Sequence, residues 1–142
     1  RVDYTNIHWA PVIHCIVKYN DKILLIQRSE KLDHPLYWSG VSGFLDDQKG
    51  LQNKVKEELK EEIGVTSKQI KSIHLGEIFH RNAPIFKKTW IVHPILVELH
   101  SNEIQLNLKE CRDFRWVNLK DINKFRLLPG FKETLKFALE KD

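Results

Sequence analysis

The sequence is poor in the residues and runs that mark zinc-binding, disulfide-bonded or membrane proteins. It contains no methionine and only two cysteines, Cys15 and Cys111, which do not stand at the paired spacing of a zinc site, so we expect neither structural zinc nor a disulfide framework. Its hydrophobic runs, such as residues 23–26, are far too short to span a bilayer, and residues 1–10 lack the apolar core of a signal peptide. We therefore expect a cytoplasmic protein without membrane contact. Since the chain begins with Arg1, we also expect its original first residue to be absent.

The chain also lacks a run of basic residues, although it is basic overall. Its net charge is +4 and its isoelectric point is about 9.0, a balance that suits an anionic ligand. Its lysines are dispersed, whereas nucleic-acid-binding proteins more often cluster their basic residues. With 142 residues, of which 42% are hydrophobic and 30% charged, we expect one soluble domain over residues 1–142.

Strand-forming and helical patterns alternate along the chain. Residues 11–19 and 22–28 are rich in β-forming residues and are joined by Asn20-Asp21, a pair that favours a hairpin turn. Later segments with strand character are 41–44, 70–79, 88–99 and 114–119, and helical patterns cover 48–63, 119–125 and 128–142. The short connections between them predict an α/β domain in which helices cover a mixed sheet.

The helix expected over about 48–63 gathers acidic residues beside its buried face. Its apolar stripe and the glycine that fits its C-terminal end are Leu51, Val55, Leu59, Ile63 and Gly64. Glu58, Glu61 and Glu62 stand three and four positions apart, and so project from one side of the helix next to that stripe. Like charges at this spacing repel one another, more strongly where water is partly excluded. A cation should therefore compensate for them, and the two candidates are Lys54, one turn before Glu58, and a divalent metal such as Mg²⁺.

The spacing of residues 43–65 resembles the Nudix box, the signature of the MutT-like Nudix hydrolase superfamily. In that family the pattern is Gly, five residues, Glu, seven residues, Arg-Glu, an aliphatic residue, any residue, Glu-Glu, any residue, Gly and an aliphatic residue. The chain matches the pattern at Gly43, Glu58, Leu59, Glu61, Glu62, Gly64 and Val65. It departs at two positions, where Lys49 replaces the first glutamate and Glu57 replaces the arginine.

Both departures reverse the charge at their position. We hypothesise that Lys49 and Glu57 form an ion pair that braces the loop before the helix, in the opposite sense to the family's glutamate and arginine. The alternative is that both side chains simply face water. In the family these two positions also help to shape the metal site, so activity is expected to suffer in either arrangement.

The resemblance implies a Nudix-type α/β/α sandwich with a mixed sheet, and metal-dependent hydrolysis of a nucleoside diphosphate linked to another moiety. Mg²⁺ or Mn²⁺ would neutralise the diphosphate and acidify the water that attacks phosphorus. By the same resemblance, the metal ligands are Glu58, Glu61, Glu62 and the backbone carbonyl of Gly43, where the missing side chain lets the backbone approach the metal. Glu110, which stands ahead of a tryptophan as a late glutamate of the family does, is a further candidate. One of these acids takes the proton from water, and the sequence leaves open which one.

Contacts to the substrate are less well defined by the sequence. Arg28 is our first choice for pairing with phosphate and Trp38 for stacking on a base. The other candidates are Arg81, Lys87 and Lys88 for phosphate, and Tyr37, Phe79 and Trp90 for the base. No short signature of a preference for ADP-ribose, dinucleoside polyphosphates, coenzyme A or NADH is clear in the sequence, so the small-molecule nucleotide remains open.

Two other functions also remain open. One is a Nudix-fold module that senses a nucleotide without cleaving it, which the altered Lys49 and Glu57 would suit. The other is an RNA-end pyrophosphohydrolase, which the basic isoelectric point allows, although RNA is the less favoured partner. Metal-dependent release of phosphate would argue against the first, and indifference to RNA against the second. The sequence does not define the oligomeric state.

Overall fold

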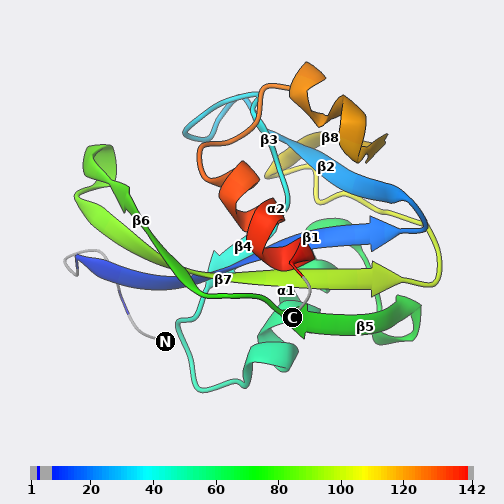
Figure 1. The fold of residues 1–142 in the computed structure, drawn as a ribbon, viewed down its shortest axis with the longest axis horizontal. Coiled ribbons are helices and arrows are strands. Elements are labelled where there is room, and N and C mark those ends of the chain that lie inside the picture. The colour runs from blue at the N-terminus through cyan, green and yellow to red at the C-terminus, as the bar shows by residue number, and fades with distance from the viewer. Residues whose placement is uncertain (1–2, 4–7, 141–142) are drawn as a thin grey trace.

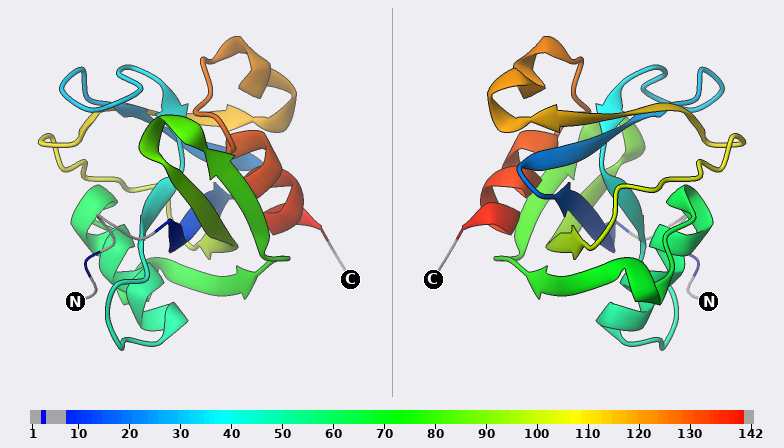
Figure 2. Two further views of the ribbon diagram at one scale, coloured as in Figure 1. Left: turned by 90° about the vertical axis from the view of Figure 1, so that its left-hand side faces the viewer. Right: turned by 90° about the vertical axis from the view of Figure 1, so that its right-hand side faces the viewer.

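The computed structural model describes residue 3 and residues 8–140, apart from the side chain of Ile85. One mixed sheet of eight strands lies between two α-helices (Figure 1), and the side views place these helices on opposite faces of the sheet (Figure 2). The strands are β1 (Trp9–Tyr19), β2 (Lys22–Arg28), β3 (Trp38–Ser39), β4 (Val41–Phe44), β5 (Ile70–Leu75), β6 (Phe79–Ala83), β7 (Lys88–Leu99) and β8 (Cys111–Asn118). The helices are α1 (Leu51–Ile63) and α2 (Phe131–Leu139), and short 3-10 helices cover Ser67–Gln69, Pro84–Phe86 and Leu119–Lys124. The fold is the predicted α/β sandwich.

Strand β1 organises the sheet. It pairs with β2 and β4 in antiparallel orientation and with β7 in parallel orientation. The predicted β1–β2 hairpin is confirmed, because Tyr19 lies opposite Lys22 and the two residues between them form the turn. Asn20 adopts a φ of 53°, a left-handed conformation that asparagine tolerates better than most residues.

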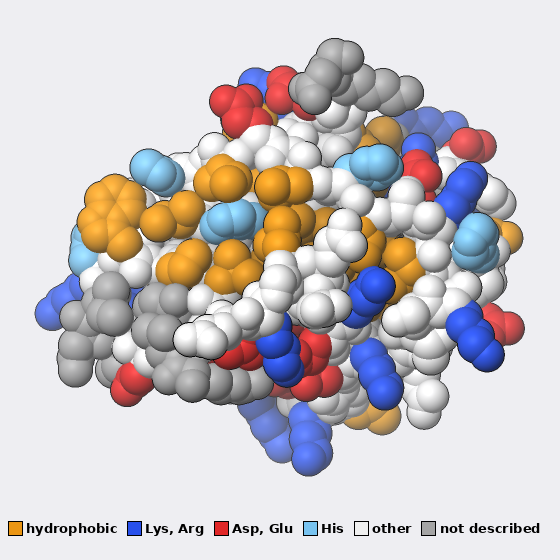
Figure 3. Space-filling model, turned by 90° about the horizontal axis from the view of Figure 1, so that it is seen from below, with side chains coloured by type: hydrophobic (Ala, Val, Ile, Leu, Met, Phe, Trp, Pro, Cys, Tyr) orange, Lys and Arg blue, Asp and Glu red, His pale blue; other side chains and the backbone are white. Residues whose placement is uncertain are grey.

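The surface carries charged and hydrophobic side chains side by side. Seen from below, acidic side chains form a patch against which Lys or Arg side chains lie, and hydrophobic side chains are exposed beside it (Figure 3).

In the described part of the chain, no helix is both long enough and apolar enough to cross a membrane.

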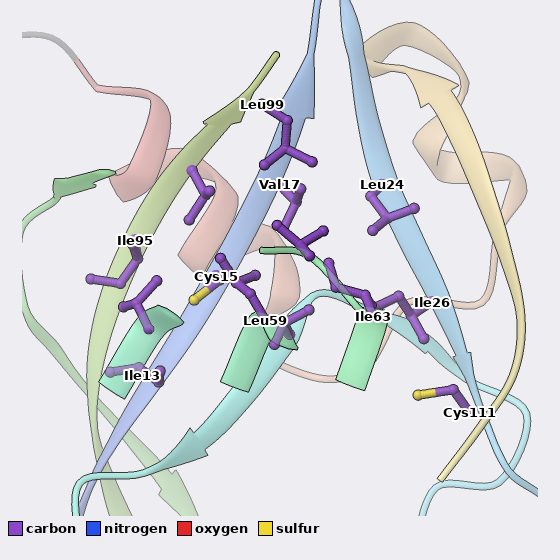
Figure 4. Packing of buried hydrophobic residues seen from close by; sticks show 14 residues of the cluster. Ile13, Cys15, Val17, Leu24, Ile26, Leu59, Ile63, Ile95, Leu99 and Cys111 are labelled. Carbon is purple, nitrogen blue, oxygen red and sulfur yellow. The ribbon is translucent and has the colours of Figure 1, made fainter. Parts of the chain in front are cut away.

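The core has two halves because the side chains of a strand alternate between the faces of the sheet. The half below α1 includes Ile13, Cys15 and Val17 of β1 with Val55, Leu59 and Ile63 of the helix (Figure 4). The half below α2 includes Ile16, Ile23 and Leu25 with Phe131 and Leu135. The two cysteines are buried free thiols.

Helix α1 begins later than predicted and ends where predicted. The pattern predicted a start at about Gln48, whereas the helix starts at Leu51 after its N-cap Gly50. At the other end, Gly64 adopts a φ of 66° and donates its N–H to the carbonyl of Lys60, as a C-terminal glycine does. The later start leaves residues 46–50 as a loop that turns back towards the helix.

The segment 70–79, predicted as one strand, is divided between β5 and β6. Both pair with β7, but β5 ends opposite Ile95 and β6 begins opposite Val92. Pro94 lies between these two positions and has no N–H to donate to a ladder, which explains the interruption. Its carbonyl instead accepts the N–H of Gly76, the residue that follows β5.

Candidate functional site

A cavity of about 670 Å³ connects the acidic side of α1 with the start of α2. It brings together seven of the eight predicted site residues, namely Gly43, Glu58, Glu61, Glu62, Glu110, Arg28 and Arg81. The eighth, Trp38, is not among the residues that line it. Its ring instead packs edge-on against Phe125, with the centroids 5.2 Å apart, in the half of the core below α2. The indole of Trp38 is therefore not placed to stack on a base in this cavity.

Gly43 of β4 allows α1 to approach the sheet closely at the acidic site. A Cβ atom on this residue would lie 2.6 Å from Cδ of Glu58, a distance that real Cβ atoms do not show. The glycine therefore leaves the space that the Glu58 carboxylate fills. Burial raises the pKa of Glu58, and the charge of Glu61 raises it further, while Lys54 acts in the opposite direction.

Glu62 is the most enclosed of the predicted ligands. Its Oε2 atom is buried and finds no hydrogen-bond partner among the described residues. Burial raises the pKa of this carboxyl group to about 9, and the charges of Glu58 and Glu110 contribute in the same direction. The backbone N–H of Ser42 opposes this shift by donating a hydrogen bond to the carboxylate. A buried carboxylate oxygen without a partner is unfavourable unless a cation or a proton compensates for it.

Lys54 reaches into the same group of acids from one turn earlier on α1. Its ammonium lies 3.2 Å from Oδ1 of Asp46 and 3.5 Å from Oε1 of Glu58. Only 2% of its side chain is exposed. Burial by itself lowers the pKa of this lysine, but the hydrogen bond to Asp46 and the surrounding carboxylates raise it above its usual value. The sequence offered two cations to compensate for the acids, Lys54 and a divalent metal. Lys54 pairs with Glu58, but it forms no ion pair with Glu61 or Glu62.

The two residues that depart from the Nudix box contact each other. The Lys49 ammonium forms a salt bridge with the Glu57 carboxylate, as hypothesised from the reversed charges. The hydrogen bond from Lys49 lowers the pKa of Glu57, so the pair is ionised around neutral pH. The loop before α1 is therefore attached to the helix by a base-acid pair.

The acidic residues fit a divalent cation. Carboxylate oxygens of Glu57, Glu58 and Glu61 lie within 4.8 Å of one another, and Glu62 adds the enclosed oxygen described above. Hard oxygen ligands of this kind suit Mg²⁺ and Mn²⁺. This grouping includes Glu57 in place of Glu62, so it differs from the predicted glutamates by one residue.

Two arginines face the cavity, and each is held by an acidic residue. Arg28 donates from Nε to the backbone carbonyl of Asp33 at 2.9 Å and from Nη2 to its carboxylate at 3.1 Å. Arg81 donates from Nη1 to Glu133 at 3.0 Å. These hydrogen bonds fix the orientation of the two guanidinium groups. Both groups are therefore already positioned at the cavity to bind a phosphate.

Three aromatic residues form part of the wall of the cavity, and sequence reasoning missed most of them. The ring of Trp90 lies 5.8 Å from that of Phe44 and 6.2 Å from that of Phe86, measured between centroids. The sequence offers Trp90 as a candidate for stacking on a base, but it does not single out Phe44 or Phe86. Phe44 follows Gly43 directly, so its position beside the box was the available signal.

His14 forms part of the cavity lining on the side of α2. Its Nε2 atom lies 3.0 Å from Oγ of Ser39, and its Nδ1 atom lies 2.9 Å from Oγ1 of Thr134. Burial lowers the pKa of His14 to about 4, so the ring is neutral at pH 7. The imidazole therefore connects β1, β3 and α2 through two hydroxyl groups.

The family of the chain follows from a comparison with family models. The model of the NUDIX domain matches residues 9–137. The chain therefore belongs to the Nudix hydrolase superfamily, as its box indicated. By class it is a hydrolase that acts on phosphoanhydride bonds. Among curated protein sequences, none matches the chain significantly.

Solved structures share the fold at low sequence identity. A MutT Nudix hydrolase from Burkholderia pseudomallei is 17% identical, with a TM-score of 0.77 over 92% of this chain and 98% of that one. An Ap4A hydrolase from C. elegans is 22% identical, with a TM-score of 0.72 over 89% and 93% of the two chains. A bifunctional NMN adenylyltransferase/ADP ribose pyrophosphatase from Francisella tularensis, complexed with AMP and a Mn ion, is 22% identical, with a TM-score of 0.72 over 92% and 41%.

Proposed function

We propose that the chain is a metal-dependent pyrophosphohydrolase that cleaves a nucleoside diphosphate linked to another moiety, with water attacking phosphorus. The observation that carries this proposal is the convergence of the acids of α1, two oriented arginines and an aromatic wall on one cavity. A nucleotide diphosphate derivative has groups that suit these features. Its anionic phosphates suit the arginines and a metal held by the acids, and its flat base suits the aromatic wall. The similar folds of an Ap4A hydrolase and of an ADP ribose pyrophosphatase support a nucleotide as substrate.

The roles of the residues follow from their places in the cavity. Glu58, Glu61 and Glu62, with the carbonyl of Gly43, would hold Mg²⁺ or Mn²⁺, which when bound neutralises the diphosphate and acidifies a water molecule. Arg28 and Arg81 would pair with the phosphate oxygens. Glu110 lies at the same cavity and, together with the α1 acids, is a candidate to accept the proton of the attacking water. Phe44, Phe86 and Trp90 would contact the base or the second moiety.

The test is turnover of a panel of nucleotide diphosphate derivatives, with Mg²⁺ or with a chelator, followed by identification of the products. We expect metal-dependent cleavage by the wild-type chain, and its loss in Glu61→Gln and Glu62→Gln without loss of the fold. Glu77→Gln is the matched control, because Glu77 is exposed and does not line the cavity. Undiminished turnover in Glu61→Gln and Glu62→Gln would refute the assignment of these residues to the reaction site. Nucleotide binding without turnover in the wild-type chain would instead identify a sensing module.

One observation favours the RNA-end alternative. A second groove along the outer side of α1 is lined by Lys49, Lys56, Lys60 and Lys68, among others. It also includes Glu57, whose carboxylate lies within 4.8 Å of those of Glu58 and Glu61, two acids that line the first cavity. The phosphates of a longer strand would therefore meet lysines next to the proposed reaction site. Affinity for a 5′-triphosphorylated RNA that falls steeply with salt, together with pyrophosphate release, would favour this substrate over small nucleotides.

A further inference from the structure

Lys54 is the one Lys, Arg, Asp or Glu residue that is buried in the described part of the chain. Its side chain is 2% exposed and lies on the face of α1 that packs against the sheet. Burying an ammonium group is unfavourable unless carboxylates surround it. An apolar side chain of similar length would satisfy packing alone, so the charge at this position calls for a reason other than packing.

Four carboxylates surround this ammonium, and they come from two segments. Besides the contacts of 3.2 Å to Asp46 and 3.5 Å to Glu58, the Nζ atom lies 3.9 Å from Oδ2 of Asp47 and 4.0 Å from Oε1 of Glu57. The aspartates belong to the loop that precedes α1, and the glutamates belong to α1 itself. The lysine therefore joins the loop to the helix within the acidic group that fits a metal.

Lys49 differs from Lys54 although both pair with Glu57. The Lys49 side chain is 52% exposed and approaches Glu57 from the solvent side. Lys54 lines the cavity together with Glu58, Glu61 and Glu62. Of these two lysines, only Lys54 lines the cavity in which a divalent cation would bind.

We propose that Lys54 is a built-in cation of the acidic site, a positioning residue that holds Glu58 and Asp46 together and lowers the affinity of the site for divalent metal. The proposal rests on the proposed function, because it concerns the same metal site. A fixed positive charge a few ångströms from a bound Mn²⁺ ion repels it. The same charge neutralises part of the acidic group without metal, so the site keeps its shape before the metal binds.

The test measures Mn²⁺ binding directly, by electron paramagnetic resonance of the free ion, in the full chain without substrate. Lys54→Met removes the charge and keeps most of the side-chain volume. Lys60→Met is the matched control, since Lys60 lies on the same helix but is exposed. We expect Lys54→Met to bind Mn²⁺ about tenfold more tightly than Lys60→Met and the wild-type chain. Without metal, we expect it to melt at a lower temperature than Lys60→Met and to gain more from added Mn²⁺.

Lys54→Gln, which lacks the charge but keeps a hydrogen-bond donor, gives the same comparison if the Met variant does not fold. Unchanged or weaker Mn²⁺ binding in the folded Lys54 variant would overturn the proposal. So would the failure of both variants to fold in the presence of Mn²⁺, because the metal should replace the missing charge. If the wild-type chain binds Mn²⁺ and cleaves nucleotides, these results overturn only the role of Lys54. If no variant binds Mn²⁺, the proposed function fails as well.

Discussion

Gly43 shows how one absent side chain controls the geometry of the acidic site. In Gly43→Ala, the new Cβ would lie 2.6 Å from Cδ of Glu58, so the carboxylate has to move. We expect kcat/KM for a nucleotide substrate to fall about 100-fold, since a displacement of this size misplaces a catalytic group, whereas stability should change little, because the atoms that must move belong to the end of a flexible side chain. Gly50→Ala is the control, because nothing lies within 4 Å of a Cβ there. Kinetics and urea unfolding of the two variants side by side check this, and equal activity would show that Glu58 is not constrained.

Glu62 illustrates a conflict between stability and function within one residue. Its pKa is raised from 4.5 to about 9 in the folded chain, so its contribution to stability is fully present below pH 4.5 and is lost as the pH rises towards 9. Without metal, we therefore expect Glu62→Gln to be more stable than the wild-type chain at pH 8. The difference should grow by up to about 4 kcal/mol between pH 5 and pH 8.

The measurement for Glu62→Gln is urea unfolding at several pH values in the presence of a chelator. Glu77→Gln should follow the wild-type chain throughout. If the variant loses turnover yet gains stability, Glu62 is supported as a cation ligand that lowers the free energy of unfolding when no metal is bound. Parallel curves for the variant and the wild-type chain would mean that the buried carboxyl group is solvated after all.

His14 acts at the scale of elements, because it joins β1, β3 and α2. Its pKa is lowered from 6.5 to about 4 by burial, so the unfolded chain binds a proton at a higher pH than the folded one. The stability it provides is complete above pH 6.5 and is lost as the pH falls towards 4. We expect the wild-type chain to lose about 2 kcal/mol more than His14→Gln between pH 7 and pH 5. Urea unfolding at both pH values measures this, with His74→Gln, an exposed histidine, as the control; the same loss in His14→Gln would contradict it.

The elements that depend on local patterns could be predicted from the sequence. Strand β7 occupies the predicted residues, and α1 ends at the predicted glycine. The errors came from interactions between elements. The start of α1 was placed too early because Asp46 pairs with Lys54 in a loop, a contact that periodicity does not report. The break between β5 and β6 reflects the partner strand, where Pro94 interrupts the ladder.

The acidic half of the site could be predicted because its residues lie close together in the sequence and keep a fixed spacing. The other half could not, because it depends on the whole molecule. The hairpin of β6 and β7 brings Trp90, which lies beside Phe86, next to Phe44, more than forty residues earlier in the chain. Trp38 precedes the same β4 strand, yet its side chain enters the core below α2. Closeness in the sequence thus predicted which carboxylates lie together in the structure, but it did not predict which aromatic residues do.

The aromatic wall allows a prediction about which residues of the cavity bind the substrate and which perform the reaction. If the acids of α1 perform the reaction and the aromatic residues hold the base or the second moiety, Phe86→Ala should raise KM and leave kcat nearly unchanged. Phe86 is 39% exposed, so its removal should perturb the fold little. The loss of one stacking contact, about 0.5–1.5 kcal/mol, corresponds to a rise in KM of roughly two- to tenfold.

Steady-state kinetics with a nucleotide substrate and with the same molecule lacking its base provide the measurement. The effect of Phe86→Ala should disappear with the truncated substrate, because the contact is then absent in both proteins. Trp9→Ala is the control, since Trp9 is exposed and aromatic but does not line the cavity. An equal rise in KM for both substrates would mean that Phe86 shapes the cavity rather than contacting the base. A fall in kcat alone would place it with the residues that orient the phosphates.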